Sequence, residues 1–101
     1  MGSIGSTPIN AASTAGRISV VALNAASWTA LPETPLASRK CIAVQNRSGI
    51  DVYLGYDSGQ AGLVGIKIAD GSERAYDIGP KIVLYAKAAS GTPSITVEEL
   101  A

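Results

Sequence analysis

The sequence predicts an all-β protein, a compact antiparallel β-sandwich or barrel of about seven short strands. Short apolar runs alternate with period two, which is typical of strands with one buried face. Glycine and proline turn signals separate these runs at short intervals. No 11-residue window shows the 3.6-residue period of an amphipathic helix. Because 101 residues suffice for one hydrophobic core, we expect a single domain over residues 17–101, preceded by an N-terminal arm over residues 1–16.

The arm is rich in glycine, serine, alanine and threonine, with Ile4 and Ile9 as its sizeable apolar side chains. Such a segment buries too little surface to fold alone. Two interpretations stay open: an unstructured terminus, or an extended arm that becomes ordered by packing against a neighbouring subunit. In the second case, Ile4 and Ile9 are candidate partner contacts.

The first half of the domain is predicted to contain one strand and one irregular crossing. Alternate apolar residues of the first run share a face that we expect to be buried: Ile18, Val20 and Ala22. Residues 28–36 include Pro32 and Pro35, which lack amide donors and disfavour a central strand. We therefore expect this stretch to cross from one sheet to the other.

The second half contains the clearest hairpin pattern. The runs 41–45 and 50–54 flank the turn residues 46–49, so we expect these two runs to pair as a hairpin. The remaining strands are predicted within residues 63–69, 74–78, 81–88 and 95–98, with turns at Asp70-Gly71, Gly79-Pro80 and residues 90–93.

The charge pattern argues against nucleic-acid and membrane partners. Eight basic residues balance eight acidic ones, and neither sign forms a run. A nucleic-acid surface needs a basic patch, and a membrane-surface helix needs basic residues gathered on one face. Residues 1–10 lack the features of a secretory signal, so we expect synthesis and folding in a cytoplasm. The single cysteine, Cys41, fits that compartment because it cannot form an internal disulfide.

The residue types also argue against catalysis. The chain has no histidine, which excludes Ser-His-Asp and Cys-His devices and zinc sites built from cysteine and histidine. Cys41 lies in an alternating run and is predicted to be a small buried hydrophobe. No spacing selects a pair among the eight carboxylates, most of which we expect to be solvated. Residues 57–60 are predicted to be a turn and not a calcium loop. We expect no enzyme activity, metal or cofactor.

Aromatic residues and one arginine are the candidates for partner contacts. The rings of Trp28 and the tyrosines would offer rigid contact area to a sugar or a partner protein, although tyrosine is also simply common in strands. Arg39 precedes a strand and is expected to pair with a carboxylate, either at a corner of the domain or across a subunit contact. The candidates within the domain are Trp28, Arg39, Tyr53, Tyr56 and Tyr85.

The order of motifs resembles a small β-domain found in virion structural proteins of tailed bacteriophages, and the resemblance covers most of the chain after the arm. One difference is Tyr56-Asp57, where a typical member has a further glycine after the Leu-Gly pair. The residues that carry the resemblance are Pro35-Leu36, Arg39, Ile42 to Asn46, Val52-Tyr53-Leu54-Gly55, Gly65, Gly71, Val83 to Ala86 and Ile95 to Glu98.

The resemblance implies a head-decoration, or cement, protein. Such a protein binds the major capsid protein of an assembled shell on the outer surface of the virion head, commonly as a homotrimer at local threefold positions. Other members lie on tails or fibres, which leaves a tail or fibre accessory subunit as an alternative. A carbohydrate-binding module is the alternative that the tyrosines and the sandwich fold suggest.

Overall fold

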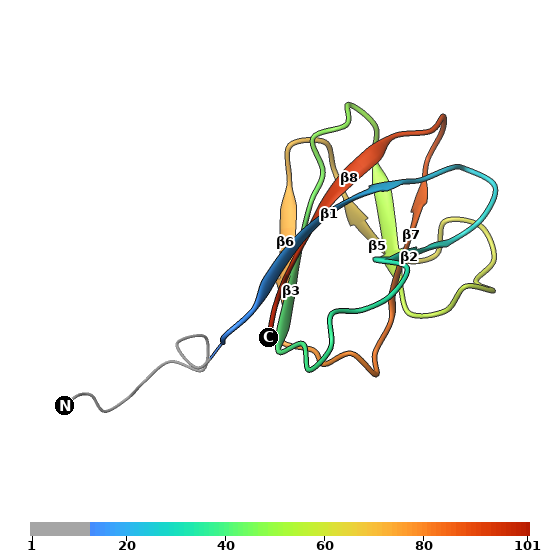
Figure 1. The fold of residues 1–101 in the computed structure, drawn as a ribbon. Helices are drawn as coiled ribbons and strands as arrows, with labels where there is room; N and C mark the ends of the chain where they lie inside the picture. Colours follow the sequence, from blue (N-terminus) through green and yellow to red (C-terminus); the bar gives the residue numbers. More distant parts are fainter. Residues whose placement is uncertain (1–12) are drawn as a thin grey trace.

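The computed structural model describes residues 13–101, which form two packed four-stranded antiparallel sheets (Figure 1). The predicted all-β fold is confirmed, and this part of the chain contains no helix. The strands are β1 (Gly16–Ala22), β2 (Thr29–Leu31), β3 (Cys41–Gln45), β4 (Val52–Gly55), β5 (Ile66–Ile68), β6 (Glu73–Tyr76), β7 (Leu84–Ala88) and β8 (Ser94–Leu100).

The chain passes repeatedly between the two sheets. The first sheet has the order β1-β8-β3-β6 and the second sheet the order β2-β7-β4-β5. As expected, the stretch from Trp28 onward enters the other sheet, where β2 forms an edge strand. Among the described strands, β4 and β5 are the one consecutive pair that are also neighbours in a sheet. The fold is therefore held together mainly by strands that are distant in sequence.

The hydrophobic core lies between the sheets and is made by alternate residues of the inner strands. In β8 and β3, for example, the inward positions are apolar and almost fully buried, while the positions between them face outward. This alternation is the pattern expected of sheets with one covered face. The core residues are Leu23, Leu31, Ile42, Val44, Val52, Leu54, Ile68, Leu84, Ala86, Ala88, Ile95 and Val97.

The hairpin predicted over residues 41–54 is wrong, because β3 and β4 belong to different sheets. The reason is the buried side chain of Asn46. Its amide nitrogen donates to the carbonyl oxygens of Ile50 (2.8 Å) and Ile68 (2.9 Å), and its amide oxygen accepts from the backbone N–H of Ser48. These bonds turn the chain across the sandwich, where a tight hairpin turn would have kept both strands in one sheet.

The buried face predicted for β1 is also wrong. Ile18 is 68% exposed and Val20 is 72% exposed, and both side chains lie on the outer face of the first sheet. The register with β8 explains the orientation, because Arg17 lies opposite Glu99, whose side chain is fully buried. An inward Arg17 forces its neighbour Ile18 outward, since successive side chains of a strand point to opposite faces.

Candidate interaction surface

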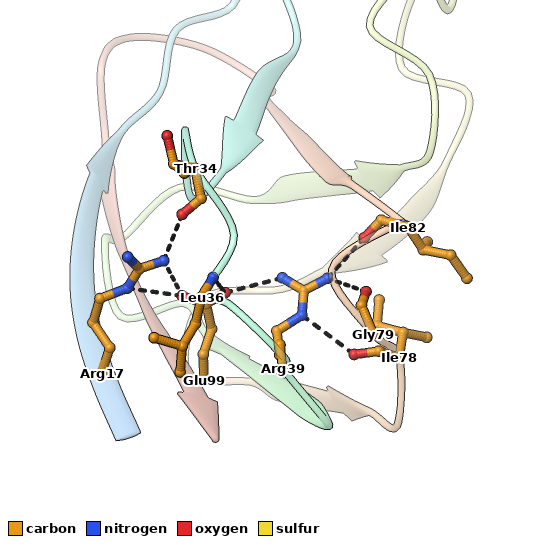
Figure 2. Close-up of polar contacts among 8 residues, drawn as sticks. All are labelled: Arg17, Thr34, Leu36, Arg39, Ile78, Gly79, Ile82 and Glu99. Carbon is orange, nitrogen blue, oxygen red and sulfur yellow. Dashed lines mark hydrogen bonds and ion pairs between the residues drawn. The ribbon is translucent and has the colours of Figure 1, made fainter. Parts of the chain in front are cut away.

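A network of ion pairs and hydrogen bonds, centred on Glu99, holds β1 against the rest of the domain (Figure 2). Glu99 of β8 accepts hydrogen bonds at Oε1 from Arg17 Nη2 (2.6 Å) and Nε (3.0 Å). Arg17 Nη2 also donates to the carbonyl oxygen of Thr34 (2.6 Å). The second carboxylate oxygen of Glu99 accepts from the backbone N–H of Leu36 at 2.9 Å. The network therefore joins β1, β8 and the segment that follows β2.

Arg39 completes this network from within the domain. Its Nη1 donates to Glu99 Oε2 at 3.0 Å, and the rest of the guanidinium donates to the carbonyl oxygens of Ile78, Gly79 and Ile82 at 2.7 to 3.2 Å. Its side chain is fully buried. The sequence left open whether Arg39 pairs with a carboxylate at a corner of the domain or across a subunit contact. The structure shows the first, with Glu99 as the carboxylate. Arg39 does not lie on the surface of the chain.

The surroundings of Glu99 keep its carboxyl ionised. Burial by itself raises the pKa of Glu99, but the N–H of Leu36 and the guanidinium groups of Arg17 and Arg39 together hold the pKa below its ordinary value. Glu99 is an exception to the expectation that most carboxylates are solvated. The signal was present in the sequence, because Glu99 continues the inward alternation of Ile95 and Val97.

The four edge strands of the sandwich differ in how well they are protected from pairing with another chain. Exposed edges are usually made short, charged or interrupted by proline. The edges β2 and β5 have three residues each, and Pro32 directly follows β2. The four-residue edge β6 carries Glu73 and Arg74. By contrast, β1 has seven residues, and Arg17, its one charged side chain, is committed to Glu99.

The hydrogen-bonding pattern shows which residues of β1 face the free edge. Ala15 and Ala101 exchange two backbone hydrogen bonds (2.9 and 2.8 Å), and the N–H of Leu23 donates to the carbonyl oxygen of Pro93 at 2.8 Å. In an antiparallel pair, bonded residues alternate with non-bonded ones. Odd-numbered residues of this strand therefore bond to β8, and even-numbered residues direct their N–H and C=O away from it. Ile18 and Val20 thus carry both the free backbone groups and the exposed apolar side chains.

We call the even-numbered residues of β1, Gly16 to Ala22, the β1 edge. A groove of about 370 Å³ runs beside it, bordered by β1 on one side and by β2 with the residues that follow on the other. Its lining includes Val20 and Val21 from β1, Thr29 and Ala30 from β2, and Glu33. The surface around the β1 edge is therefore mainly apolar, uncovered by residues 13–101, and suited to an extended segment.

Two of the candidate tyrosines lie together on a different face. Tyr53 of β4 and Tyr85 of β7 are half-buried on the outer face of the second sheet. The register places Tyr53 opposite Lys87 and Tyr85 opposite Gly55, so the two rings come from diagonal positions on adjacent strands. Lys67 lies opposite Tyr53 on the other side. This face combines aromatic and basic side chains.

The other aromatic candidates do not join that face as one platform. Trp28 is 7% exposed, and its indole N–H donates to the carbonyl oxygen of Gln60 at 2.9 Å, so it supports the loop before β5. Tyr56 is 58% exposed in that loop. Asp57 accepts the N–H of Gly59 at 2.8 Å, which makes residues 57–60 a turn, as predicted.

The remaining predicted residues contribute less to a site. Ile4 and Ile9 lie outside the described residues. Cys41 is half-buried at an outward position of β3 and not in the core, because Ile42 and Val44 take the inward positions. Within residues 13–101, no three acidic or cysteine side chains come close enough to hold a metal ion.

Comparison of the chain with protein families and with curated proteins gives no match. No helix in the described part of the chain is long and apolar enough to cross a membrane.

Proposed function

We propose that this chain is a structural protein of a tailed-bacteriophage virion, a decoration or cement protein that binds the assembled head. Its partner is the major capsid protein, and its place is the outer surface of the head, where it sits as a homotrimer. The motifs from Pro35 to Glu98 support the proposal by their resemblance to such proteins. The chain has no catalytic role in this proposal.

The observation that carries the proposal is the β1 edge, which residues 13–101 leave uncovered. Ile18 and Val20 are large apolar side chains on the same face of the longest edge strand, and the one charged side chain of that strand, Arg17, is bound to Glu99. A free monomer gains nothing from such an edge, whereas a subunit of an assembly uses it for contact. Zero net charge and only 16% charged residues also suit a protein whose surface is covered by neighbours.

The physical role would be stabilisation by linkage. A protein that binds only the assembled shell shifts the equilibrium towards that state. Because a shell offers many copies of the same site, weak individual contacts add up across the lattice. The sandwich, in which Glu99 binds both Arg17 and Arg39, would supply an ordered surface for these contacts.

The test is co-sedimentation of the purified chain with expanded capsid shells of the phage that encodes it. We expect saturable binding at a fixed ratio to the major capsid protein, and no binding to unexpanded shells as the control. A chain that stays in the supernatant with expanded shells would contradict head decoration. Electron microscopy of virions with a labelled chain would then test the tail or fibre alternative.

A carbohydrate-binding module is the second candidate, favoured by the diagonal positions of Tyr53 and Tyr85 on the outer face of the second sheet. Aromatic rings of this kind stack on sugar faces, and the adjacent Lys87 would suit an acidic sugar. This candidate requires saturable binding to a glycan array that Tyr85→Ala abolishes. It also requires that the chain ignore capsid shells.

A further inference from the structure

We propose that the β1 edge binds the β1 edge of a second copy of this chain, in antiparallel register centred on Ser19. The inference rests on the proposed assembly role, because it names the partner of the surface that carries that role. It concerns the purified chain alone, so its test does not depend on any shell.

The β1 edge is complementary to itself. In a twofold pair centred on Ser19, Ile18 lies opposite Val20 of the second copy, and Gly16 lies opposite Ala22 of the second copy. All of these are even-numbered residues, which direct their N–H and C=O to the free edge. Each pair can therefore exchange two backbone hydrogen bonds, as antiparallel strands require.

The same register also covers the exposed apolar side chains of the β1 edge. Residues directly opposite in an antiparallel pair point to the same face. Ile18, 68% exposed, would thus pack against Val20 of the second copy, 72% exposed, and the reverse contact follows by symmetry. Hydrogen bonds and side-chain burial are satisfied by one register.

Other registers lose the hydrogen bonds or separate Ile18 from Val20 of the second copy. A centre on Ile18 or Val20 keeps the hydrogen bonds, but it places Val20 opposite Gly16 or Ile18 opposite Ala22, so one of the two large side chains faces a small residue. A centre between two residues pairs even-numbered with odd-numbered positions, so the free backbone groups of one copy meet groups already bonded to β8. A centre on Arg17 or Val21 keeps the hydrogen bonds but moves Ile18 opposite Gly16 or Asn24, so its contact with Val20 is lost. Centring on Ser19 also keeps the two Arg17 side chains at opposite ends of the paired strands, each held by its own Glu99.

The pairing would join the two first sheets into one continuous eight-stranded sheet, in the order β6-β3-β8-β1 followed by its symmetry mate. Such an isologous contact closes on itself and covers the β1 edge of both copies, which leaves the short, charged β6 at each end of the sheet. A trimer joins unlike surfaces, so it would use other parts of the molecule. The twofold contact could then link chains of neighbouring trimers.

The register is tested by cysteine cross-linking of the full chain in a Cys41→Ser background. Ser19 and its symmetry mate would be a non-hydrogen-bonded pair with Cα atoms about 4.5 Å apart, within the range of roughly 4.4–6.8 Å that a disulfide spans. We expect Ser19→Cys to give a covalent dimer under mild oxidation. Val21→Cys is the control on the same strand, because the two Val21 positions would lie about 13 Å apart along the strands. Absence of the Ser19→Cys dimer, or an equal yield from Val21→Cys, would overturn the proposal.

The surface is tested by Val20→Lys, with light scattering and sedimentation equilibrium over a range of chain concentrations. A lysine at this exposed position leaves the monomer folded but brings like charges together in the pair. We expect self-association to weaken by roughly tenfold or more. Val64→Lys is the matched control, because Val64 is 69% exposed but lies in the loop before β5. Equal self-association of both variants and the parent, or a parent that stays monomeric at all concentrations, would overturn the proposal. Thermal unfolding of each variant confirms that it is folded.

Discussion

The two longest strands, β1 and β8, lie side by side and have opposite patterns. In β8, the apolar Ile95 and Val97 face the core, while Thr96 and Glu98 face outward. In β1, the positions facing inward include Arg17, and the outward positions carry Ile18 and Val20. The central strand β8 thus turns its apolar side chains inward, as is usual, whereas the edge strand β1 turns its large apolar side chains outward.

The difference shows that side-chain polarity alone did not decide which face of β1 is buried. The buried carboxylate of Glu99 requires a charged partner on the same face, and Arg17 lies directly opposite it. Turning Arg17 outward would leave the buried Glu99 carboxylate with Arg39 as its one cationic partner. The free-energy cost of that loss exceeds the cost of exposing two apolar side chains to water. The outward apolar residues then become available for contact with another chain.

The largest effect on stability should come from removing the charge of Glu99, which draws Arg17 inward and so turns Ile18 and Val20 outward. We expect Glu99→Gln to lower the free energy of unfolding by about 3–5 kcal/mol, because it leaves the buried guanidinium of Arg39 without its carboxylate. Glu98→Gln is the matched control, since Glu98 is the exposed neighbour on the same strand and should change the stability by less than about 0.5 kcal/mol. Urea denaturation of both variants gives the comparison, and equal losses would contradict the role assigned to Glu99.

A smaller and graded effect is expected in acid. Because the folded state holds the pKa of Glu99 below its ordinary value, the ionised carboxylate stabilises the fold above the unfolded-state pKa of about 4.3. This contribution is lost as the pH falls through the folded-state pKa. The stability difference between the parent and Glu99→Gln should therefore be constant near neutral pH and shrink below about pH 4. Denaturation at several pH values measures it, and a difference that grows in acid would contradict the assigned sign.

The smallest effect on folding should come from the outward residues of β1. We expect Ile18→Thr and Val20→Thr each to change the free energy of unfolding by no more than about 0.5 kcal/mol, because both side chains are already in water and threonine suits a strand. The measurement is made at a chain concentration low enough for the parent to be monomeric. Val97→Thr, at a fully buried position of β8, should cost well over about 1 kcal/mol, since it buries a hydroxyl group in the core. Similar losses at Val20 and Val97 would mean that the β1 edge is covered within the monomer.

The sequence predicted the fold class and most strand positions because period-two alternation and turn residues are local signals. It did not predict which strands share a sheet. The turn residues 46–49 read equally as a hairpin or as a crossing, and the buried amide of Asn46, which binds the distant carbonyl of Ile68, decides for the crossing. Such a contact between remote segments leaves no pattern in neighbouring residues.

The candidate surface was predicted only in part, for a related reason. Arg39 was correctly expected to need a carboxylate, but no spacing identified Glu99, which lies 60 residues away. Ile18 and Val20 were recognised as one face of a strand and assigned to the wrong side. That assignment could be made only after Arg17 and Glu99 were known to face each other. The tyrosines were predicted as a group, and the register of β4 with β7 brings only Tyr53 and Tyr85 to adjacent positions.

The pairing of β1 with β8 also has a consequence for the order of events during synthesis. β1 is synthesised well before β8, its neighbour in the sheet, and such pairing between distant segments makes folding slow. Until β8 has been made, β1 has no neighbour in its sheet and neither of its faces is fixed. A partly synthesised chain therefore lacks the ordered β1 edge, which keeps unfinished chains out of any assembly built through that edge.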